Sequence, residues 1–305
     1  MITVSLIGGL GNQMFQYAAG KALAERHSVR LALDLSGFHN DPLRSFLLDR
    51  LLVPEAIATT EGTADTRGKA KGNFERVKWK GRIDRLLRRA GLPQMVQSPH
   101  EYREPHFHYD PVFEGLSSHT TLFGYFQTER YFAPIAEQLR GWFSLREPVV
   151  DGASEILARI EASRLPVSVH VRRGDYLNPG TAEFHGIVGE PYYREALGRL
   201  EQAIGGEAEL FVFSDDPAAA ESVLNFVPKS RLVHVRGAPE RPWEDMALMA
   251  RCRHHVIANS SFSWWGAWLN GGEGKQVIAP RQWFAPAELK NLNTTDLYPA
   301  GWIVV

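Results

Sequence analysis

The stretch PVSVHVRRGDYL, residues 166–177, combines a strand pattern with an abrupt polar ending. Three valines alternate with Ser168 and His170, which is typical of a β-strand whose two faces differ. Two arginines, Arg172 and Arg173, follow where the strand should end. A guanidinium fork matches phosphate through two parallel charge-assisted hydrogen bonds, which a lysine cannot copy. The stretch therefore predicts a buried strand that ends at an anion site.

The sequence on both sides of this stretch alternates between strand-like and helix-like runs. Further strands are expected at 209–214, 231–235, 254–258 and 275–280, and helices at 191–204, 217–225, 243–252 and 262–270. At the start of the chain, a strand at 2–7 and the break GGLGNQ precede a helical run to residue 27 and a strand at 29–35. Strands that alternate with helices predict an α/β fold, with a parallel, doubly wound sheet in the C-terminal part.

Length and composition limit the class of protein. The 305 residues suggest about two domains, and interruptions at Pro148 and Gly152 place the boundary so that they span 1–150 and 151–305. Hydrophobic residues make up 44%, charged residues 23%, and the net charge is −1, so bulk charge indicates neither nucleic acid nor membrane. The single cysteine, Cys252, fits a reducing cytoplasm; it is either a buried bystander or a nucleophile. We expect a cytoplasmic protein without a secretory signal.

One basic segment departs from this balance. Residues 67–89 hold ten Lys or Arg against two acids, and apolar residues share one face of the helix expected at its end. The segment is interpreted as a solvated surface helix or as a peripheral contact with an anionic membrane surface. Nucleic acid is disfavoured, because no recognised binding motif accompanies the charge.

Polar groups follow three of the expected strands, where ligands of parallel sheets bind. These groups are His170, Arg172 and Arg173; Ser214, Asp215 and Asp216; and Asn259, Ser260, Ser261, Phe262 and Ser263. The last group begins a helix, whose free N–H groups and positive dipole end attract phosphate. The sequence therefore predicts one anion-binding site built from three strand ends.

Each group also has a structural interpretation. The Arg pair can form a surface salt bridge, with Asp175 as the obvious partner. The serines can serve as an ordinary helix N-cap. Asp215 and Asp216 can bind a ribose hydroxyl or a base amine, or Asp216 can cap the helix after Pro217.

The N-terminal glycines suggest a different class of enzyme. Gly9 and Gly11 follow a strand, and Asp34 ends the next one, as in a nicotinamide-binding fold. However, Met14 occupies the place of the third glycine of G-x-G-x-x-G, so the match is weak. This interpretation also leaves the Arg pair and the serines without a role.

Taken together, the motifs resemble those of the α-1,2-fucosyltransferases of glycosyltransferase family 11. The resemblance rests on HVRRGDY at 170–176 and on five further segments, in order along nearly the whole chain. These are IGGLGNQMFQYAAGKALA at 7–24, GYFQTERYF at 124–132, FVFSDDP at 211–217, VIANSSFSWWGAWLN at 256–270 and VIAPRQWF at 277–284. It is weakest around 62–92.

The resemblance implies transfer of L-fucose from GDP-β-L-fucose to the 2-hydroxyl of a galactose-containing glycan, with inversion and without metal or cofactor. It implies a GT-B-like pair of Rossmann-like domains that face a cleft, with the donor mostly in the C-terminal domain and the acceptor on the N-terminal side. Arg173 or Arg172 would hold the β-phosphate, Ser261 and Ser263 the diphosphate, and His170 with Asp215 or Asp216 the guanosine. Asn12 would lie near the reacting sugar.

The general base and the acceptor contacts stay open at this stage. Asp175, Glu183 and His185 are candidate bases, and water or the donor phosphate are alternatives. Aromatic residues of EPHFHYDP, at 104–111, either stack on the acceptor or pack internally. The alternatives to the fucosyltransferase are a transferase for another GDP-sugar and a non-catalytic GDP-sugar sensor.

Overall fold

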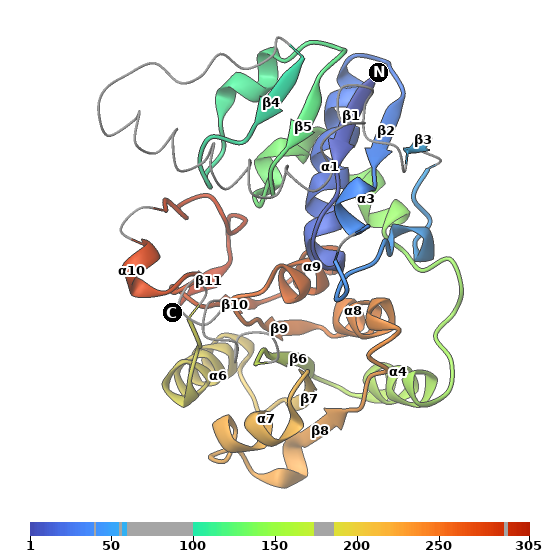
Figure 1. Ribbon diagram of the computed structural model, residues 1–305. Coiled ribbons are helices and arrows are strands. Elements are labelled where there is room, and N and C mark those ends of the chain that lie inside the picture. Colours follow the sequence, from blue (N-terminus) through green and yellow to red (C-terminus); the bar gives the residue numbers. More distant parts are fainter. Residues whose placement is uncertain (40, 55–56, 60–99, 174–185, 290–291) are drawn as a thin grey trace.

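The computed structural model describes residues 1–39, 41–54, 57–59, 100–173, 186–289 and 292–305 (Figure 1). The N-terminal part forms a five-stranded parallel sheet in the order β3-β2-β1-β5-β4. Its strands are β1 (Ile2–Ser5), β2 (Leu31–Asp34), β3 (Ile57–Thr59), β4 (Glu101–Arg103) and β5 (Thr121–Phe123). The first helix, α1 (Leu10–Arg26), begins inside the GGLGNQ segment that we expected to be a loop.

The C-terminal part forms a six-stranded parallel sheet in the order β11-β10-β9-β6-β7-β8. Its strands are β6 (Pro166–Val171), β7 (Glu209–Ser214), β8 (Leu232–Val235), β9 (His254–Val256), β10 (Val277–Ala279) and β11 (Ile303–Val304). The strands predicted at 166–171 and 209–214 are confirmed to the residue.

Helices cover both faces of this second sheet, as the alternating pattern predicted. They are α4 (Gly152–Ala162), α6 (Glu190–Ile204), α7 (Pro217–Val223), α8 (Pro242–Arg251) and α9 (Ser261–Leu269). The valines of β6 pack with α6 and α7 on one face, whereas Phe211 and Phe213 of β7 pack with α4 and α8 on the other. Every residue of β6 is buried, because the strand is covered on both faces.

Shorter helices complete the described residues. The α-helices are α3 (Ala136–Trp142) and α10 (Pro286–Leu289), and the 3-10 helices are Ser36–Phe38, Leu48–Arg50, Pro111–Gly115, Glu129–Tyr131, Ala133–Ile135 and Lys229–Arg231.

The largest hydrophobic cluster joins the two parts of the chain. Phe15 of α1 lies 4.6 Å from Trp264 and 4.8 Å from Trp265 of α9, measured between ring centroids. Both tryptophans are fully buried, and Trp268 on the next turn of α9 belongs to the same cluster. Figure 1 shows α9 lying directly against the lower end of α1. A shared aromatic core of this size fixes the two helices relative to one another.

The two sheets lie on either side of the expected boundary near residue 150. The division into domains 1–150 and 151–305 stays a prediction, since α9 contributes to a core that also contains α1.

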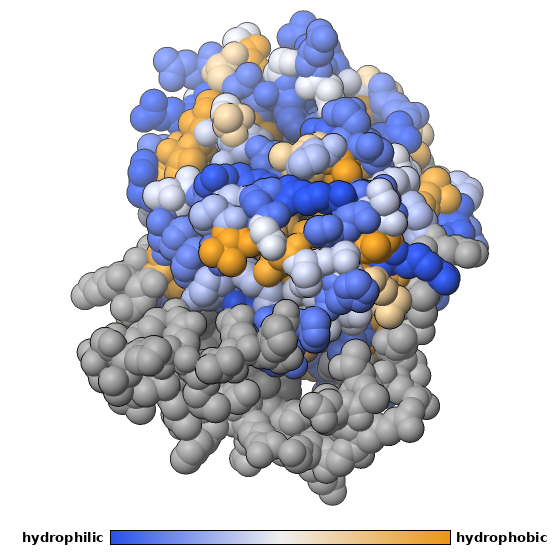
Figure 2. All heavy atoms as spheres, turned by 90° about the horizontal axis from the view of Figure 1, so that it is seen from above, coloured by the Kyte–Doolittle hydropathy of each residue, from blue (hydrophilic) through white to orange (hydrophobic). Residues whose placement is uncertain are grey.

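The surface seen from above the first sheet is mainly hydrophilic where the structure describes it, with small hydrophobic groups between polar ones (Figure 2). Among the described residues, no helix is both long and apolar enough to cross a membrane.

Candidate functional site

The end of β6 is organised by one carboxylate from the end of β7. The two strands pair so that Val171 lies opposite Ser214, which brings Asp215 beside the arginines. One oxygen of Asp215 accepts a hydrogen bond from the backbone N–H of Arg173 at 2.8 Å, and the other lies 2.5 Å from the Arg172 guanidinium. The salt-bridge interpretation therefore holds for Arg172, which pairs with Asp215, whereas the expected partner Asp175 lies outside the described residues. Asp215 positions the arginine pair.

Arg173 and His170 are buried polar residues with unsatisfied nitrogens. The side chain of Arg173 is 8% exposed and its Nη1 has no hydrogen-bond partner among the described residues. The same holds for Nδ1 of His170, a residue that is 5% exposed and lies 5.8 Å from the Phe262 ring. Burial, together with the neighbouring Arg172 charge, lowers the pKa of His170 far below its ordinary value, so the ring is neutral. Buried polar atoms without partners are uncommon and require an explanation, of which a ligand is one.

The remaining residues at the end of β7 have local structural roles. Ser214 Oγ lies 2.7 Å from the carbonyl oxygen of Val171 and accepts a hydrogen bond from the Asp216 N–H at 3.0 Å. Asp216 Oδ1 accepts from the N–H of Ala219 at 3.0 Å, so Asp216 is the N-cap of α7. Of the two interpretations of Asp216, the structure favours the cap.

The serines at the start of α9 use their hydroxyl groups within the protein. Ser260 is the N-cap and accepts from the N–H of Phe262 at 3.3 Å, and the buried Ser263 donates to the carbonyl of Ser260 at 3.3 Å. Ser261 donates to Asn12 at 2.8 Å. Each hydroxyl thus has a protein partner in this conformation, and the expectation that these hydroxyls cradle a phosphate stays a prediction. What the helix start can offer an anion is its backbone N–H groups and its dipole.

Two helix N-termini meet at this point. A Cβ added to Gly11, in the first turn of α1, would lie 2.6 Å from the backbone carbon of Ser261, so only glycine allows this approach. Trp265 also donates from Nε1 to the carbonyl of Gly11 at 3.0 Å. Neither α1 nor α9 has an acidic residue in its first turn. Two adjacent positive dipole ends without a neutralising carboxylate form a site that favours an anion.

Asn12 ties this junction to the end of β5. Its Oδ1 accepts from Ser261 Oγ at 2.8 Å and from Gln127 Nε2 at 2.9 Å. Gly9 is the N-cap residue of α1, without a side-chain cap. Asn12 therefore lies between the two parts of the chain, and two donors hold its carboxamide oxygen in place, while its place near the reacting sugar stays a prediction.

Asn259 connects the loops behind the junction. Its Nδ2 donates to the carbonyl groups of Gly186 and Trp283, both at 3.3 Å, and the side chain is buried. These contacts hold together the segments that follow β9 and β10 and the residues that precede α6.

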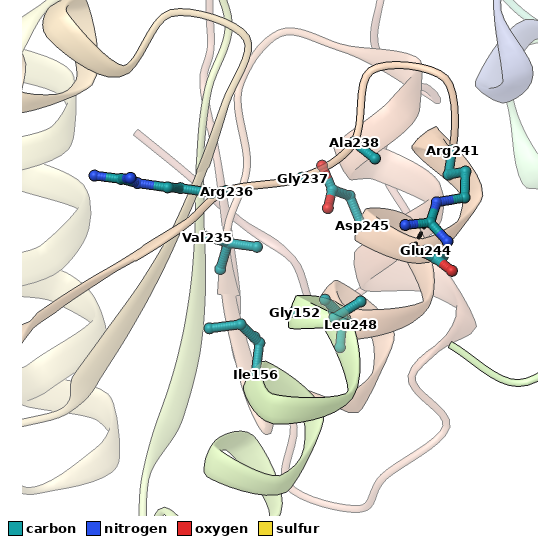
Figure 3. Close-up of a pocket in the computed structure, with 11 residues that line it drawn as sticks. Gly152, Ile156, Val235, Arg236, Gly237, Ala238, Arg241, Glu244, Asp245 and Leu248 are labelled. Carbon is teal, nitrogen blue, oxygen red and sulfur yellow. Dashed lines mark ion pairs between the residues drawn. The ribbon is translucent and has the colours of Figure 1, made fainter. Parts of the chain in front are cut away.

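A further pocket of about 60 Å³ lies at the end of the edge strand β8, which the sequence did not predict (Figure 3). Val235, Ile156 and Leu248 form its apolar side, and the carboxylate of Asp245 points toward the backbone of Gly237. A Cβ at Gly237 would lie 2.2 Å from Asp245 Oδ2, so a larger residue here would displace the carboxylate. Burial, with a smaller contribution from Glu244, raises the pKa of Asp245 to about 7.

Asp245 was missed because it sits in the first turn of α8, where an acidic residue is ordinary. The only signal in the sequence was that its helix, α8, follows β8, a strand whose carboxyl end lies at the same edge of the sheet.

Tyr109 in the aromatic segment 104–111 is buried, whereas His106 is exposed. The rings of His106 and His108 stack at 3.6 Å, and Arg130 lies 4.2 Å from the centre of the Tyr109 ring. Tyr109 thus packs internally, and acceptor contacts of the two histidines stay a prediction.

Several predicted residues lie outside the described residues: the candidate bases Asp175, Glu183 and His185, and the basic stretch 67–89.

Cys252 is buried, and burial raises the pKa of its thiol, which argues against a thiolate nucleophile. In the part of the chain that is described, no cluster of three or more His, Cys, Asp or Glu is arranged to hold a metal ion.

Comparison with known proteins identifies the family of the chain. The model of glycosyl transferase family 11 matches residues 97–305. An α-1,2-colitosyltransferase from Escherichia coli is 32% identical and covers 99% of this chain and 98% of its own length. The O-antigen biosynthesis glycosyltransferase WbnK from Escherichia coli is 33% identical, with 98% of each chain covered. Galactoside α-(1,2)-fucosyltransferase 1 from Lagothrix lagotricha is 31% identical over 47% of this chain and 41% of its own length.

Solved structures support the fold. A mutant of FUT1 from Arabidopsis thaliana in complex with GDP superposes with a TM-score of 0.50 at 13% identity, covering 94% of this chain and 72% of its own. The α/β architecture with two parallel sheets is therefore GT-B-like, as expected. The family match over the C-terminal two-thirds, together with relatives aligned over the full length, shows that this chain is a glycosyltransferase and belongs to glycosyl transferase family 11.

Proposed function

We propose that the enzyme transfers L-fucose from GDP-β-L-fucose to the 2-hydroxyl of a galactose-containing glycan, with inversion and without a metal or cofactor. Three of its relatives are named for α-1,2 transfer of fucose or colitose. The observation that carries the proposal is Arg173, whose buried Nη1 has no hydrogen-bond partner among the described residues, at the sheet edge where two helix N-termini meet.

The diphosphate of the donor binds Arg173 and the starts of α9 and α1. Arg173 supplies the fork, fixed at its backbone by Asp215, and the helix starts supply N–H groups and positive potential. Since neither helix carries an acid in its first turn, the helix starts themselves add no negative charge that would repel the phosphates. These groups balance the charge that Mg²⁺ balances in many other enzymes.

The guanine base binds toward the pocket beside β8. Strands lie about 4.8 Å apart, so the ends of β6 and β8, separated by β7, are roughly 10 Å from one another. That span suits a nucleoside diphosphate whose phosphates lie at β6. The carboxylate of Asp245 matches the two adjacent N–H donors of guanine, and the apolar side of the pocket suits its ring.

The reaction then needs no covalent intermediate with the enzyme. The acceptor hydroxyl attacks C1 of the sugar from the face opposite the departing GDP, and its proton goes to a base among Asp175, Glu183 and His185, to water or to the donor phosphate. Negative charge grows on the β-phosphate as the bond breaks, and Arg173 and the helix starts are already oriented toward that charge. One such preorganised donor is typically worth about 3–4 kcal/mol.

A second donor, GDP-colitose, is supported by the full-length similarity to an α-1,2-colitosyltransferase. Colitose differs from fucose only by the missing 3-hydroxyl, so the diphosphate and guanine contacts serve both donors.

A donor panel with lactose as acceptor tests the proposal. GDP-fucose, GDP-colitose, GDP-mannose and UDP-galactose are supplied in turn, and the product linkage is determined by NMR. We expect an α-1,2-linked product with GDP-fucose or GDP-colitose and much slower transfer from the other two donors. Transfer from UDP-galactose at a comparable rate would refute the guanine assignment. Absence of transfer from every GDP-sugar would refute the whole proposal.

A further inference from the structure

The turn Gly124–Gln127, which follows β5, places two adjacent aromatic rings in opposite environments. Phe126 is fully buried among Tyr102, Phe113 and Tyr131, whereas the side chain of Tyr125 is 44% exposed. Phe126 has a φ of +54°, in the left-handed region that non-glycine residues seldom adopt. Such strain persists only where the surrounding structure holds the backbone firmly, and it is frequent at functional sites.

Side chains from two other elements hold this turn. Glu104, after β4, accepts hydrogen bonds from the N–H groups of Tyr125 at 2.7 Å and Phe126 at 3.1 Å. Gln16 of α1 donates to the carbonyl of Gly124 at 3.1 Å. Burial raises the pKa of Glu104 to about 7, against the effect of the two N–H donors, so the protein keeps this carboxyl buried at a cost in free energy. Exposed turns are usually loose, and this one is fixed.

The same turn is joined to the donor side of the molecule. Gln127 donates to Asn12 at 2.9 Å, and Asn12 also accepts from Ser261 at the start of α9. Tyr125 is thus two residues away from a chain of hydrogen bonds that ends at the proposed diphosphate site. It follows β5 of the first sheet, in the part of the chain where the acceptor is expected.

An exposed tyrosine whose backbone is fixed by Glu104 has a chemical use in this place. Its ring offers a flat apolar face with little conformational freedom to lose on binding. The C–H groups at C3, C4 and C5 of galactose form a matching apolar face. We propose that Tyr125 is the platform of the acceptor site and stacks on the galactose ring that receives the transferred sugar. This assignment rests on the proposed function.

Kinetics of three variants test the platform. Tyr125→Ala removes the ring, Tyr125→Trp keeps a stacking face, and Val112→Ala is the control, since Val112 is 64% exposed on the same part of the chain. We expect Tyr125→Ala to raise the KM for lactose about tenfold or more, while Tyr125→Trp and the control stay within about threefold of the native enzyme. The Kd of GDP, measured by calorimetry, should be unchanged in all three. An unchanged lactose KM in Tyr125→Ala, or an equal loss of GDP affinity, would overturn the proposal.

Saturation-transfer NMR of lactose with the GDP-bound protein separates this inference from the proposed function, because it requires no turnover. We expect the galactose C3–C5 protons to receive most saturation in the native protein and much less in Tyr125→Ala. If the native protein shows this pattern but transfers no sugar, the platform stands and the proposed function fails. The platform is refuted if the native protein and Tyr125→Ala transfer equal saturation to lactose. It is also refuted if the native protein transfers none.

Discussion

At the carboxyl edge of the first sheet, the buried side-chain amides of Gln13 and Gln16 each donate to backbone carbonyls and accept from a backbone N–H. Gln13 donates to the carbonyls of Gly8 and Ser45 and accepts from the N–H of Leu47, at 2.8–2.9 Å. At the corresponding edge of the second sheet, Arg173 and His170 each keep one buried nitrogen without a hydrogen-bond partner among the described residues. Both edges bury polar side chains, but the two glutamines have their partners, whereas Arg173 and His170 each lack one among the described residues.

The difference separates structural from functional polar groups. A buried amide with all its partners stabilises the loops that it joins, and its removal leaves unpaired backbone groups behind. A buried guanidinium without full partners lowers stability until an anion arrives. Mutations at the two edges should therefore have opposite signatures in stability and in activity.

The largest effect is expected at Arg173. Arg173→Lys keeps the charge but loses the fork, so kcat/KM for the donor should fall about 10²–10³-fold. The thermal unfolding midpoint should stay near that of the native protein. Arg159→Lys, an exposed arginine that pairs with Glu209, is the matched control and should leave kcat/KM unchanged. Near-normal turnover of Arg173→Lys would show that the unsatisfied polar groups of the second edge are not functional.

Gln16→Leu should show the reverse signature. Gln16 is fully buried, accepts from the N–H of Ile7 at 3.0 Å and donates to the carbonyl of Gly124. Leucine leaves both backbone groups unpaired, so the free energy of unfolding should drop by about 2–5 kcal/mol in urea titrations. Arg173→Met should not lower it, because that change removes a buried, partly unpaired charge. A Gln16→Leu protein as stable as the native one would contradict the structural role.

Asp245→Asn sharpens the comparison at the far end of the second edge. If the ionised carboxylate accepts hydrogen bonds from guanine, the Kd of GDP should rise about 10- to 100-fold. Because the pKa of Asp245 is raised to about 7, GDP affinity of the native enzyme should increase as pH rises from 6 to 8. The other charged residues that line this pocket are Glu244, which contributes to that raised pKa, Arg241, which pairs with Glu244, and Arg236.

Calorimetric titrations of the native enzyme and of Asp245→Asn at several pH values check this assignment. The pH dependence should vanish in the variant, and inosine diphosphate, which lacks the 2-amino group, should distinguish the two proteins less than GDP does. Equal GDP affinity of both proteins across the pH range would remove Asp245 from the site.

The smallest effect is expected from metal removal. If Arg173 and the helix starts balance the diphosphate charge, excess chelator should leave the transfer rate unchanged. A loss of activity that Mn²⁺ or Mg²⁺ restores would show that protein groups alone do not balance the charge of the diphosphate.

Much of the architecture follows from the sequence because hydrophobic periodicity is a local property. Strands β6 and β7 match their predicted limits, and the alternation of strands and helices implied the parallel sheet that the structure has. The start of α1 differed, because Gly9 and Gly11 suggested a loop, whereas Gly11 is required where the helix meets Ser261. A glycine needed for close packing has the same appearance in a sequence as one needed for a turn.

Residue types and strand ends are local features, and they were enough to predict that polar residues gather at the carboxyl edge of a parallel sheet. Which of these side chains find a protein partner depends on the tertiary structure. Ser261 finds its partner in Asn12, 249 residues away, Asp215 serves the arginines, and Arg173 keeps a buried nitrogen without a hydrogen-bond partner among the described residues. Hydrogen-bond partners depend on which distant segments pack together, and no local pattern encodes that choice.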